Sequence, residues 1–155
     1  MTNYSLNKYN ANFINNTDAT QDDQGSKWSL TALKRKFKAL GIDGDKIFKK
    51  IEDIVIKTII SGENVINNAT EMFVPYSNNC FELLGFDILI DDNFEPWLLE
   101  VNLSPSLNCD SPLDQKIKSN LIADLFNLAG VVHNDERKVG EPGLAKKAAA
   151  KFRVY

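Results

Sequence analysis

Two strand-like segments, joined by a short turn-rich connection, constrain the fold of this sequence most. The first runs from Cys80 to Ile90 and the second from Trp97 to Asn102, and apolar residues dominate both. Residues 91–96 between them read Asp-Asp-Asn-Phe-Glu-Pro, a composition typical of turns. The pattern predicts an antiparallel hairpin. With its turn centred on Asn93 and Phe94, the numbers of facing residues add up to 187.

This register places two acidic side chains opposite each other. Side chains alternate between the faces of a strand, so Asp87 faces Glu100 and Gly85 faces Asn102. Leu98 is expected on the same face as Glu100. The other face is predicted to be apolar throughout, and we therefore expect the sheet to be covered on both sides. That face comprises Leu84, Phe86, Ile88, Ile90, Trp97, Leu99 and Val101.

The facing acids suggest a site for a divalent cation. Two carboxylates opposite each other repel, and burial increases the cost. The oxygens of Asp87, Glu100 and Asn102 match the ligand chemistry of Mg²⁺ and would leave coordination positions open for phosphates. Gly85 beside them gives a ligand room to approach. The same spacing also fits two acids at a solvated sheet edge with no role in binding.

Helix signals flank the hairpin. Ser29 is suited to cap a helix that runs through Leu40 and ends at Gly41. Asp43 is suited to cap a second helix, which either continues to about residue 73 or restarts after Gly62. Ser111 and Pro112 fit the start of a last helix, which ends at Gly130.

The remaining segments carry weaker signals. We expect a short strand or turn near residues 2–6 and a polar loop up to residue 27. Pro75 and the pair Asn78-Asn79 mark a turn. Residues 131–155 lose periodicity and read as a tail, whose end is either a short basic helix that touches an acidic partner or a solvated segment.

Composition excludes several classes of function. The net charge of −3 provides no broad basic field for nucleic acid. No apolar run approaches the roughly 18 residues of a membrane span. His133 is the only histidine, which argues against a histidine zinc site or a serine–histidine triad, and leaves an oxygen-ligated metal. Two cysteines, Cys80 and Cys109, form no disulfide framework, so we expect a reducing, cytoplasmic setting.

Three lysines are candidates for binding anions. Lys27 precedes a helix start and could bind an anion there, although an ordinary surface lysine is the default reading of the position. Lys116 and Lys118 lie in the first turns of the last predicted helix. Lysines favour the other end of a helix, so an anionic partner would suit this position but is not required.

The hairpin and several other segments resemble the tubulin tyrosine ligase-like family. The similarity runs in order over residues 2–132 and is closest in the hairpin. The form Val-Asn-Leu-Ser-Pro-Ser-Leu at 101–107 is more similar to the glutamate-adding members than to the tyrosine-adding enzyme. The matching segments are CFELLGFDILI at 80–90, PWLLEVNLSPSL at 96–107, TNYSLNK at 2–8, GSKWS at 25–29, IKTIIS at 56–61, SPLD at 111–114 and KIK at 116–118.

The resemblance implies an ATP-grasp ligase that forms an acyl phosphate on a glutamate of the tubulin tail and joins free L-glutamate to it. Its fold would be α/β, more strictly α+β, with an antiparallel sheet flanked by helices. It also implies cytoplasmic work on microtubules, with the cilium or basal body as one location. By the family pattern, Asp87, Glu100 and Asn102 bind Mg²⁺ and serve catalysis, Thr2 and Asn3 contact ATP, and Tyr4, Ser5, Lys27 and Lys118 line the amino-acid pocket.

One departure from the family pattern shapes the remaining expectations. Family members begin well upstream of Met1, and that upstream region carries the lysines that clamp ATP. We therefore expect residues 1–132 to be the C-terminal part of an incomplete ATP-grasp domain, followed by the tail at 133–155. Alone, the chain is expected to be inactive and marginally folded. The alternatives are a tubulin-binding module without turnover and an inactive structural remnant.

Overall fold

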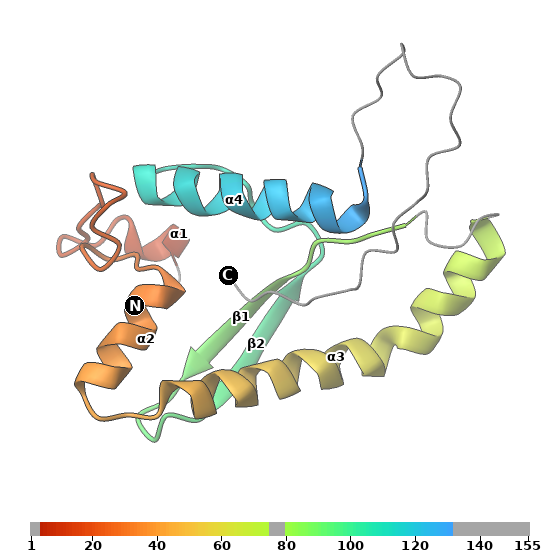
Figure 1. The fold of residues 1–155 in the computed structure, drawn as a ribbon, viewed down its shortest axis with the longest axis horizontal. Coiled ribbons are helices and arrows are strands. Elements are labelled where there is room, and N and C mark those ends of the chain that lie inside the picture. The colour runs from red at the N-terminus through yellow and green to blue at the C-terminus, as the bar shows by residue number, and fades with distance from the viewer. Residues whose placement is uncertain (1–3, 75–79, 132–155) are drawn as a thin grey trace, which may run out of the picture. The chain divides into compact units, whose positions relative to one another are not determined.

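The structure is a computed structural model that describes residues 4–74 and 80–131. Its element order in these ranges confirms the α/β class, with one antiparallel pair of strands among helices (Figure 1). The chain comprises two compact units, residues 31–106 and residues 1–30 with 107–155. The elements are α1 (Tyr4–Asn7), α2 (Leu30–Ala39), α3 (Gly44–Phe73), β1 (Gly85–Ile90), β2 (Pro96–Asn102) and α4 (Pro112–Ala129).

The hairpin of β1 and β2 turns half a position earlier than the sequence predicts, so facing residue numbers next to the turn add up to 186 instead of 187. Asp91 N–H donates to the Glu95 carbonyl at 3.0 Å, and Phe94 N–H donates to the Asp91 carbonyl at 3.0 Å. Phe94 adopts φ 61°, which closes a three-residue loop centred on Asn93. The Asp91 carboxylate fixes this loop by accepting from the backbone N–H groups of Asn93 and Glu95. The predicted centre between Asn93 and Phe94 is therefore wrong.

A β-bulge in β2 restores the predicted pairing beyond the turn. Ile88 pairs with Leu98, whereas Asp87 pairs with Glu100, so Leu99 is the extra residue of the bulge. The early turn and the bulge shift the register by one residue in opposite directions. Asp87 therefore faces Glu100 as predicted, and Gly85 faces Asn102 as predicted.

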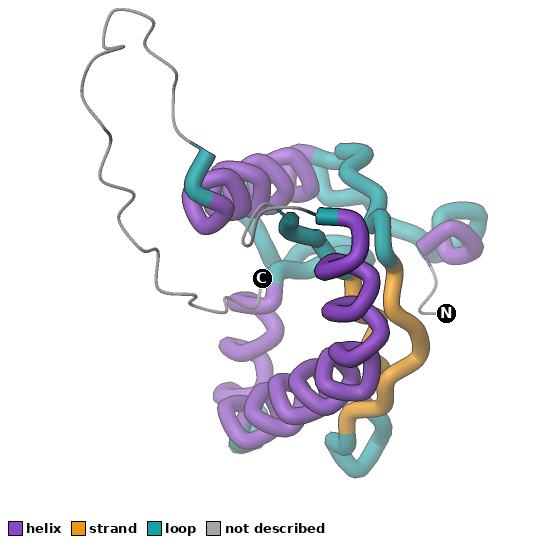
Figure 2. Tube along the Cα trace, turned by 90° about the vertical axis from the view of Figure 1, so that its right-hand side faces the viewer, coloured by secondary structure: helices purple, strands orange, loops and turns teal. Residues whose placement is uncertain are grey.

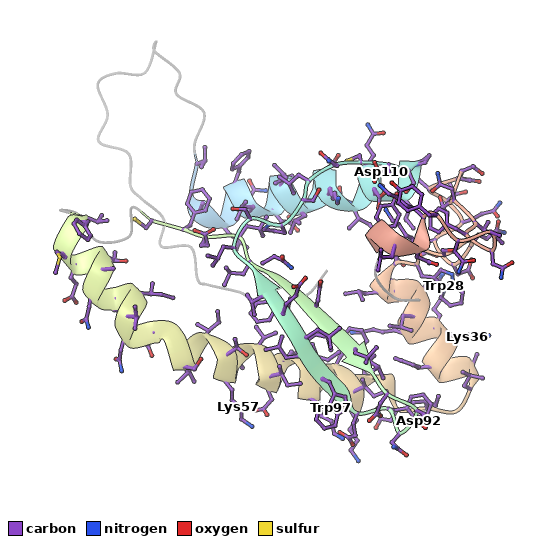
Figure 3. The ribbon with its side chains drawn as sticks, turned by 180° about the vertical axis from the view of Figure 1, so that it is seen from behind. Trp28, Lys36, Lys57, Asp92, Trp97 and Asp110 are labelled. Atoms are coloured by element: carbon purple, nitrogen blue, oxygen red, sulfur yellow. The ribbon has the colours of Figure 1, made fainter. Side chains whose placement is uncertain are left out.

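The bulge also overturns part of the predicted assignment of faces. Leu98 pairs with Ile88 and thus leaves the face of Glu100, and Trp97 pairs with Leu89 and thus joins the face of Asp87. Trp97 and Leu99 are each 59% exposed, so in the described chain the hairpin is not covered on both sides. Figure 3 shows Trp97 with Asp92 at the turn end of the hairpin.

Helices α2 and α3 form the support of the hairpin within residues 31–106. Asp43 caps α3 by accepting from Lys46 N–H at 3.1 Å, as predicted, and Gly41 turns the chain with φ 72°. α3 runs through Gly62 without restarting and lies beside β2 (Figure 1, Figure 2). The buried core of this unit is small and lies where α2 meets α3; it consists of Ala32, Phe37, Ile47 and Phe48.

The second unit contains α1, the polar loop and α4. Residues 4–7 form a helical turn, so the predicted strand or turn near residues 2–6 is wrong for the described part. Asn10 ends this region by accepting from Asn12 N–H, a local bond that competes with continued helix. Buried Asn16 orders the following loop by donating to the carbonyls of Gln21 and Gln24.

Helix α4 follows its predicted signals. The Ser111 hydroxyl accepts from Asp114 N–H at 3.1 Å, Pro112 occupies the first turn, and Gly130 ends the helix with φ 75°. Both cysteines are free and exposed. No described helix has the length and apolar character of a membrane span. The predicted turn at Pro75, the ATP contacts Thr2 and Asn3, and the tail 133–155 lie outside the described residues.

Candidate metal and amino-acid sites

The first candidate site is the carboxylate pair at the open end of the hairpin. Asp87 and Glu100 are cross-strand partners next to the bulge, and Asn102 follows Glu100 by two residues on the same face. The Asn102 amide donates to a Glu100 carboxylate oxygen at 3.5 Å. The structure therefore brings together all three residues that the sequence predicts as metal ligands.

Gly85 holds the other end of this site by close packing. A Cβ built on Gly85 would lie 2.9 Å from the Pro105 Cβ and 3.6 Å from the Asn102 Cβ. Any larger residue would have to displace the loop that follows Asn102. Gly85, which was predicted to give a ligand room to approach, thus fixes the segment that carries the candidate ligand Asn102.

The two carboxylates disturb each other electrostatically. Loss of solvent raises the pKa of Asp87, and its hydrogen bond and charge interaction with Glu100 raise that pKa further. A cation placed between the two carboxylates would offset their repulsion and lower the pKa of Asp87. Within the described ranges, no three histidine, cysteine or acidic side chains come together, so this pair with Asn102 is a site of two carboxylates and one amide.

The donor set fits Mg²⁺. The ion takes oxygen ligands and is commonly held by one or two protein carboxylates, its other positions remaining for water and phosphate. Asp87 and Glu100 are exposed, so substrate oxygens can reach the site. The Asn102 amide can present its oxygen in place of its nitrogen by turning over, which would end its donation to Glu100.

The second candidate site surrounds Lys27, in the unit that contains α1 and α4. The Lys27 ammonium lies 2.8 Å from an Asp114 carboxylate oxygen and 3.7 Å from the centre of the Tyr4 ring. The Lys27 and Asp114 side chains are only 26% and 13% exposed. Partial burial acts to raise the pKa of Asp114, but the bond and charge of Lys27 outweigh it and lower that pKa. Tyr4 and Lys27, predicted together, are thus in contact.

Lys118 lies one turn beyond Asp114 on α4, on the same side of the helix. Its ammonium donates to the Asn108 carbonyl in the loop before the helix. Lys116, by contrast, donates to the Ala19 carbonyl at 3.3 Å. Ser5 belongs to α1.

Asp114 is the residue that the sequence analysis missed. It lies in the family-like segment 111–114, where an acid in the first helical turn reads as an ordinary complement to the helix dipole. Its partner Lys27 is 87 positions away, a separation that no local pattern bridges. The only sequence signal for this pairing would have been that the lysine and the acid both lie in family-like segments.

Comparisons with known proteins agree on one family. The model of the tubulin-tyrosine ligase family matches residues 1–139. The tubulin polyglutamylase TTLL5 of Mus musculus is 50% identical over 135 residues, which cover 87% of this chain and 10% of that protein. The tubulin monoglutamylase TTLL4 of Homo sapiens is 48% identical over 143 residues, 92% of this chain and 12% of that protein. The polyglutamylase ttll-5 of Caenorhabditis elegans is 43% identical over 148 residues, 94% and 20% respectively.

Proposed function

Because the chain belongs to the tubulin-tyrosine ligase family, we propose that it forms the metal-binding and amino-acid-binding part of an ATP-dependent ligase. The proposed reaction adds glutamate to glutamate side chains of tubulin tails. The observation that carries the proposal is the facing pair Asp87 and Glu100, with Asn102 beside it. The names of the relatives, tubulin polyglutamylases and a monoglutamylase, support tubulin as acceptor and glutamate as substrate. The chain spans about a tenth of the length of the first relatives.

The proposed chemistry needs no nucleophile from the protein. The acceptor carboxylate takes the terminal phosphoryl group of ATP, and ADP leaves. The amine of free glutamate then attacks the acyl phosphate, inorganic phosphate leaves, and an amide bond forms. Mg²⁺, when bound, would supply neutralisation of phosphate charge. The part of this chain is to hold the reactants in place and to balance their charges.

The lysines of the second site would receive the carboxylates of free glutamate. An ammonium carries three donors, and Lys27 directs one of them to Asp114. The remaining donors can serve a substrate carboxylate while Asp114 and Tyr4 hold the ammonium in place. We propose the same role for Lys118, with Ser5 in the pocket wall and Thr2 and Asn3 as ATP contacts. Residues 1–132 would be the working part and 133–155 a tail.

The relatives also bear on location and on the main alternative. Action on tubulin places the proposed enzyme at the microtubule cytoskeleton in the cytoplasm, with the cilium or basal body as a narrower proposal. The alternative is a module that binds tubulin without turnover. The tie between Lys27 and Asp114 favours it, because a lysine already paired can serve structure alone.

A chimera tests the proposal. Residues 1–135 of this chain replace the matching segment of the mouse polyglutamylase, and the product is incubated with ATP, Mg²⁺, labelled glutamate and microtubules. We expect the chimera to incorporate label and its Glu100→Gln variant to incorporate none, because a ligand of the metal loses its charge. Asp92→Asn is the matched control, since it neutralises an exposed acid in the hairpin loop. Incorporation by the Glu100→Gln chimera at the control rate would refute the proposal.

A further inference from the structure

We infer that the surface formed by α2 and the first turns of α3 binds a glutamate-rich acceptor segment. The inference rests on the proposed function. Its first support is charge segregation: seven of the 18 basic residues of this chain, whose net charge is −3, lie between positions 34 and 50, against two acids, Asp43 and Asp45. The seven are Lys34, Arg35, Lys36, Lys38, Lys46, Lys49 and Lys50.

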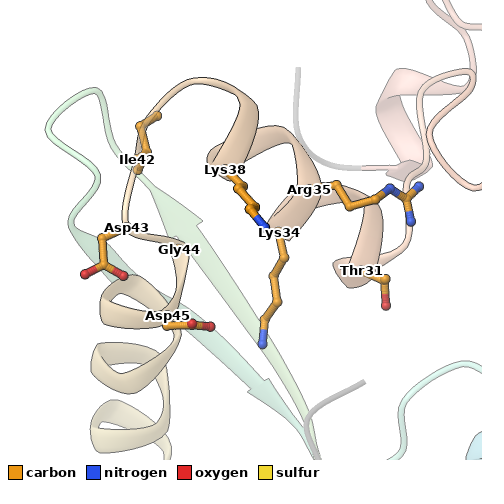
Figure 4. A pocket seen from close by; sticks show the side chains of 8 residues that line it. All are labelled: Thr31, Lys34, Arg35, Lys38, Ile42, Asp43, Gly44 and Asp45. Atoms are coloured by element: carbon orange, nitrogen blue, oxygen red, sulfur yellow. The ribbon is translucent and has the colours of Figure 1, made fainter.

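A hollow on this surface gathers three of the cations. Lys34, Arg35 and Lys38 line one side of a pocket of about 410 Å³, and the turn into α3, with Asp43 and Asp45, lines the other. Figure 4 shows the Lys34 side chain extending down from α2 opposite Asp45, whereas the Arg35 side chain points away from α3. All three basic side chains belong to exposed residues. An anionic chain lying in the hollow could therefore reach several cations at once.

The two acids leave this surface positive. The Asp43 carboxylate is used as the cap of α3 and accepts from Lys46 N–H. Asp45 lies in the first turn of α3, where the helix dipole favours an acid. Lys34 and Lys38 stand one turn apart on α2, a like-charge spacing that disfavours the helix. An acidic partner would relieve that repulsion.

The scaffold beneath the cations is fixed by packing. Phe37 is buried, and a Cβ built on Gly44 would lie 3.2 Å from its ring, so the turn between α2 and α3 is tight. The Lys34 ammonium lies 4.2 Å from the centre of the Phe48 ring. A surface held in this way loses little conformational freedom when it binds a partner.

The position of the surface relative to the carboxylate pair suits an acceptor. Phe37 meets Phe94 edge-on at 6.1 Å, and Lys50 pairs with Glu95, so the surface adjoins the turn end of the hairpin. Asp87 lies four residues along β1 from Asp91, roughly 13 Å at the rise of a strand. An extended acidic segment that binds the surface and continues along the hairpin could place a further glutamate at the pair. The ligand class is thus a polypeptide with repeated carboxylates.

The test measures how tightly the 155-residue chain binds a labelled peptide of twelve glutamates. Fluorescence anisotropy of the label reports the binding. We expect Lys34→Gln/Arg35→Gln/Lys38→Gln to weaken binding at least tenfold. The matched control Lys8→Gln/Lys57→Gln/Lys116→Gln removes equal charge elsewhere and should weaken it less than threefold. Circular dichroism checks that each variant folds. If the triple variant unfolds, Lys38→Gln alone replaces it, and we expect this single change to weaken binding two- to fourfold.

Two features of the test separate this inference from the proposed function and from general anion binding. The peptide titration contains no ATP, no metal and no free glutamate, so peptide binding stands or falls independently of ligation. A labelled uridine oligonucleotide of equal charge should bind at least tenfold more weakly than the peptide. Equal losses in the two triple variants, or equal binding of the oligonucleotide, would overturn the inference.

Discussion

Asp87 and Glu100 oppose each other at a cost that a metal would remove. Like charges directly opposite in a sheet destabilise it. The pKa of Asp87 is raised by loss of solvent first and by its hydrogen bond and charge interaction with Glu100 second. Local conflicts of this kind are common at functional sites.

Neutralising one acid of the pair should therefore stabilise the chain when no metal is present. In EDTA, we expect Glu100→Gln to raise the free energy of unfolding by about 0.5 kcal/mol, as measured by urea denaturation. With Mg²⁺ in excess the gain should vanish, because only the unchanged chain would then be stabilised by binding. A loss of stability in EDTA would show that the two carboxylates do not repel each other.

Asp114 offers a test of the pair that organises the second site. We expect Asp114→Asn to lower the free energy of unfolding by about 1 kcal/mol at pH 7, because the part-buried Lys27 loses its charged partner. The folded-state pKa of Asp114 is lowered, so its contribution is present above the ordinary aspartate pKa of about 3.9 and is lost as pH falls through the folded value.

Denaturation at pH 7 and pH 2.5 measures both parts of this prediction. Asp110→Asn is the control, since only the backbone of Asp110 contacts Asp114. A cost that stays the same at both pH values would contradict the assigned charge interaction.

Lys118 tests the proposed amino-acid pocket at the level of a single residue. In the chimera, Lys118→Ala should raise the Michaelis constant for glutamate roughly tenfold, because the substrate loses about the free energy of one charged hydrogen bond. The Michaelis constant for ATP should stay unchanged. Lys116→Ala is the control on the same helix. A rise in the constant for ATP alone would remove Lys118 from the pocket.

At the scale of elements, the hairpin depends on close packing at Gly85. Gly85→Ala should lower the free energy of unfolding by about 1–3 kcal/mol and weaken metal binding, because the new methyl group meets Pro105 at 2.9 Å and shifts the loop after Asn102. Pro105→Gly in the same chain removes the obstructing Cβ and should recover part of both losses. Metal affinity unchanged in Gly85→Ala would show that the loop does not position Asn102.

Local signals predicted most of the elements. Ser111, Asp43 and the glycines at 41 and 130 act as caps and turns because their chemistry works within a few residues. The bulge escaped prediction because Leu99 is one apolar residue among several, and nothing in composition marks it as extra. The facing of Asp87 and Glu100 was predicted correctly only because the early turn and the bulge offset each other.

Long-range relations were out of reach of the sequence. The pairing of Lys27 with Asp114 spans 87 positions, and the Tyr4 ring of the helical turn at residues 4–7 packs against Phe13. The basic surface of α2 became a candidate site only when the turn at residues 40–43 placed α2 against the start of α3.

At the scale of the whole molecule, the proposed metal ligands and the proposed amino-acid residues belong to different compact units. Asp87, Glu100 and Asn102 lie within residues 31–106, and Tyr4, Lys27 and Lys118 lie in the other unit. The hairpin also leaves Trp97 and Leu99 largely exposed. We therefore expect this chain alone to ligate no glutamate. Label incorporated by the isolated chain above its Glu100→Gln control would contradict that expectation.

The central claim is that the carboxylate pair of the hairpin binds a divalent cation. Titration of the 155-residue chain with Mn²⁺, which accepts the same oxygen ligands as Mg²⁺, tests it most directly through the relaxation of water protons. We expect one saturable Mn²⁺ site for which Mg²⁺ competes, which is lost in Glu100→Gln and kept in Asp92→Asn. Saturable binding of equal strength in Glu100→Gln, or none in the unchanged chain, would contradict it.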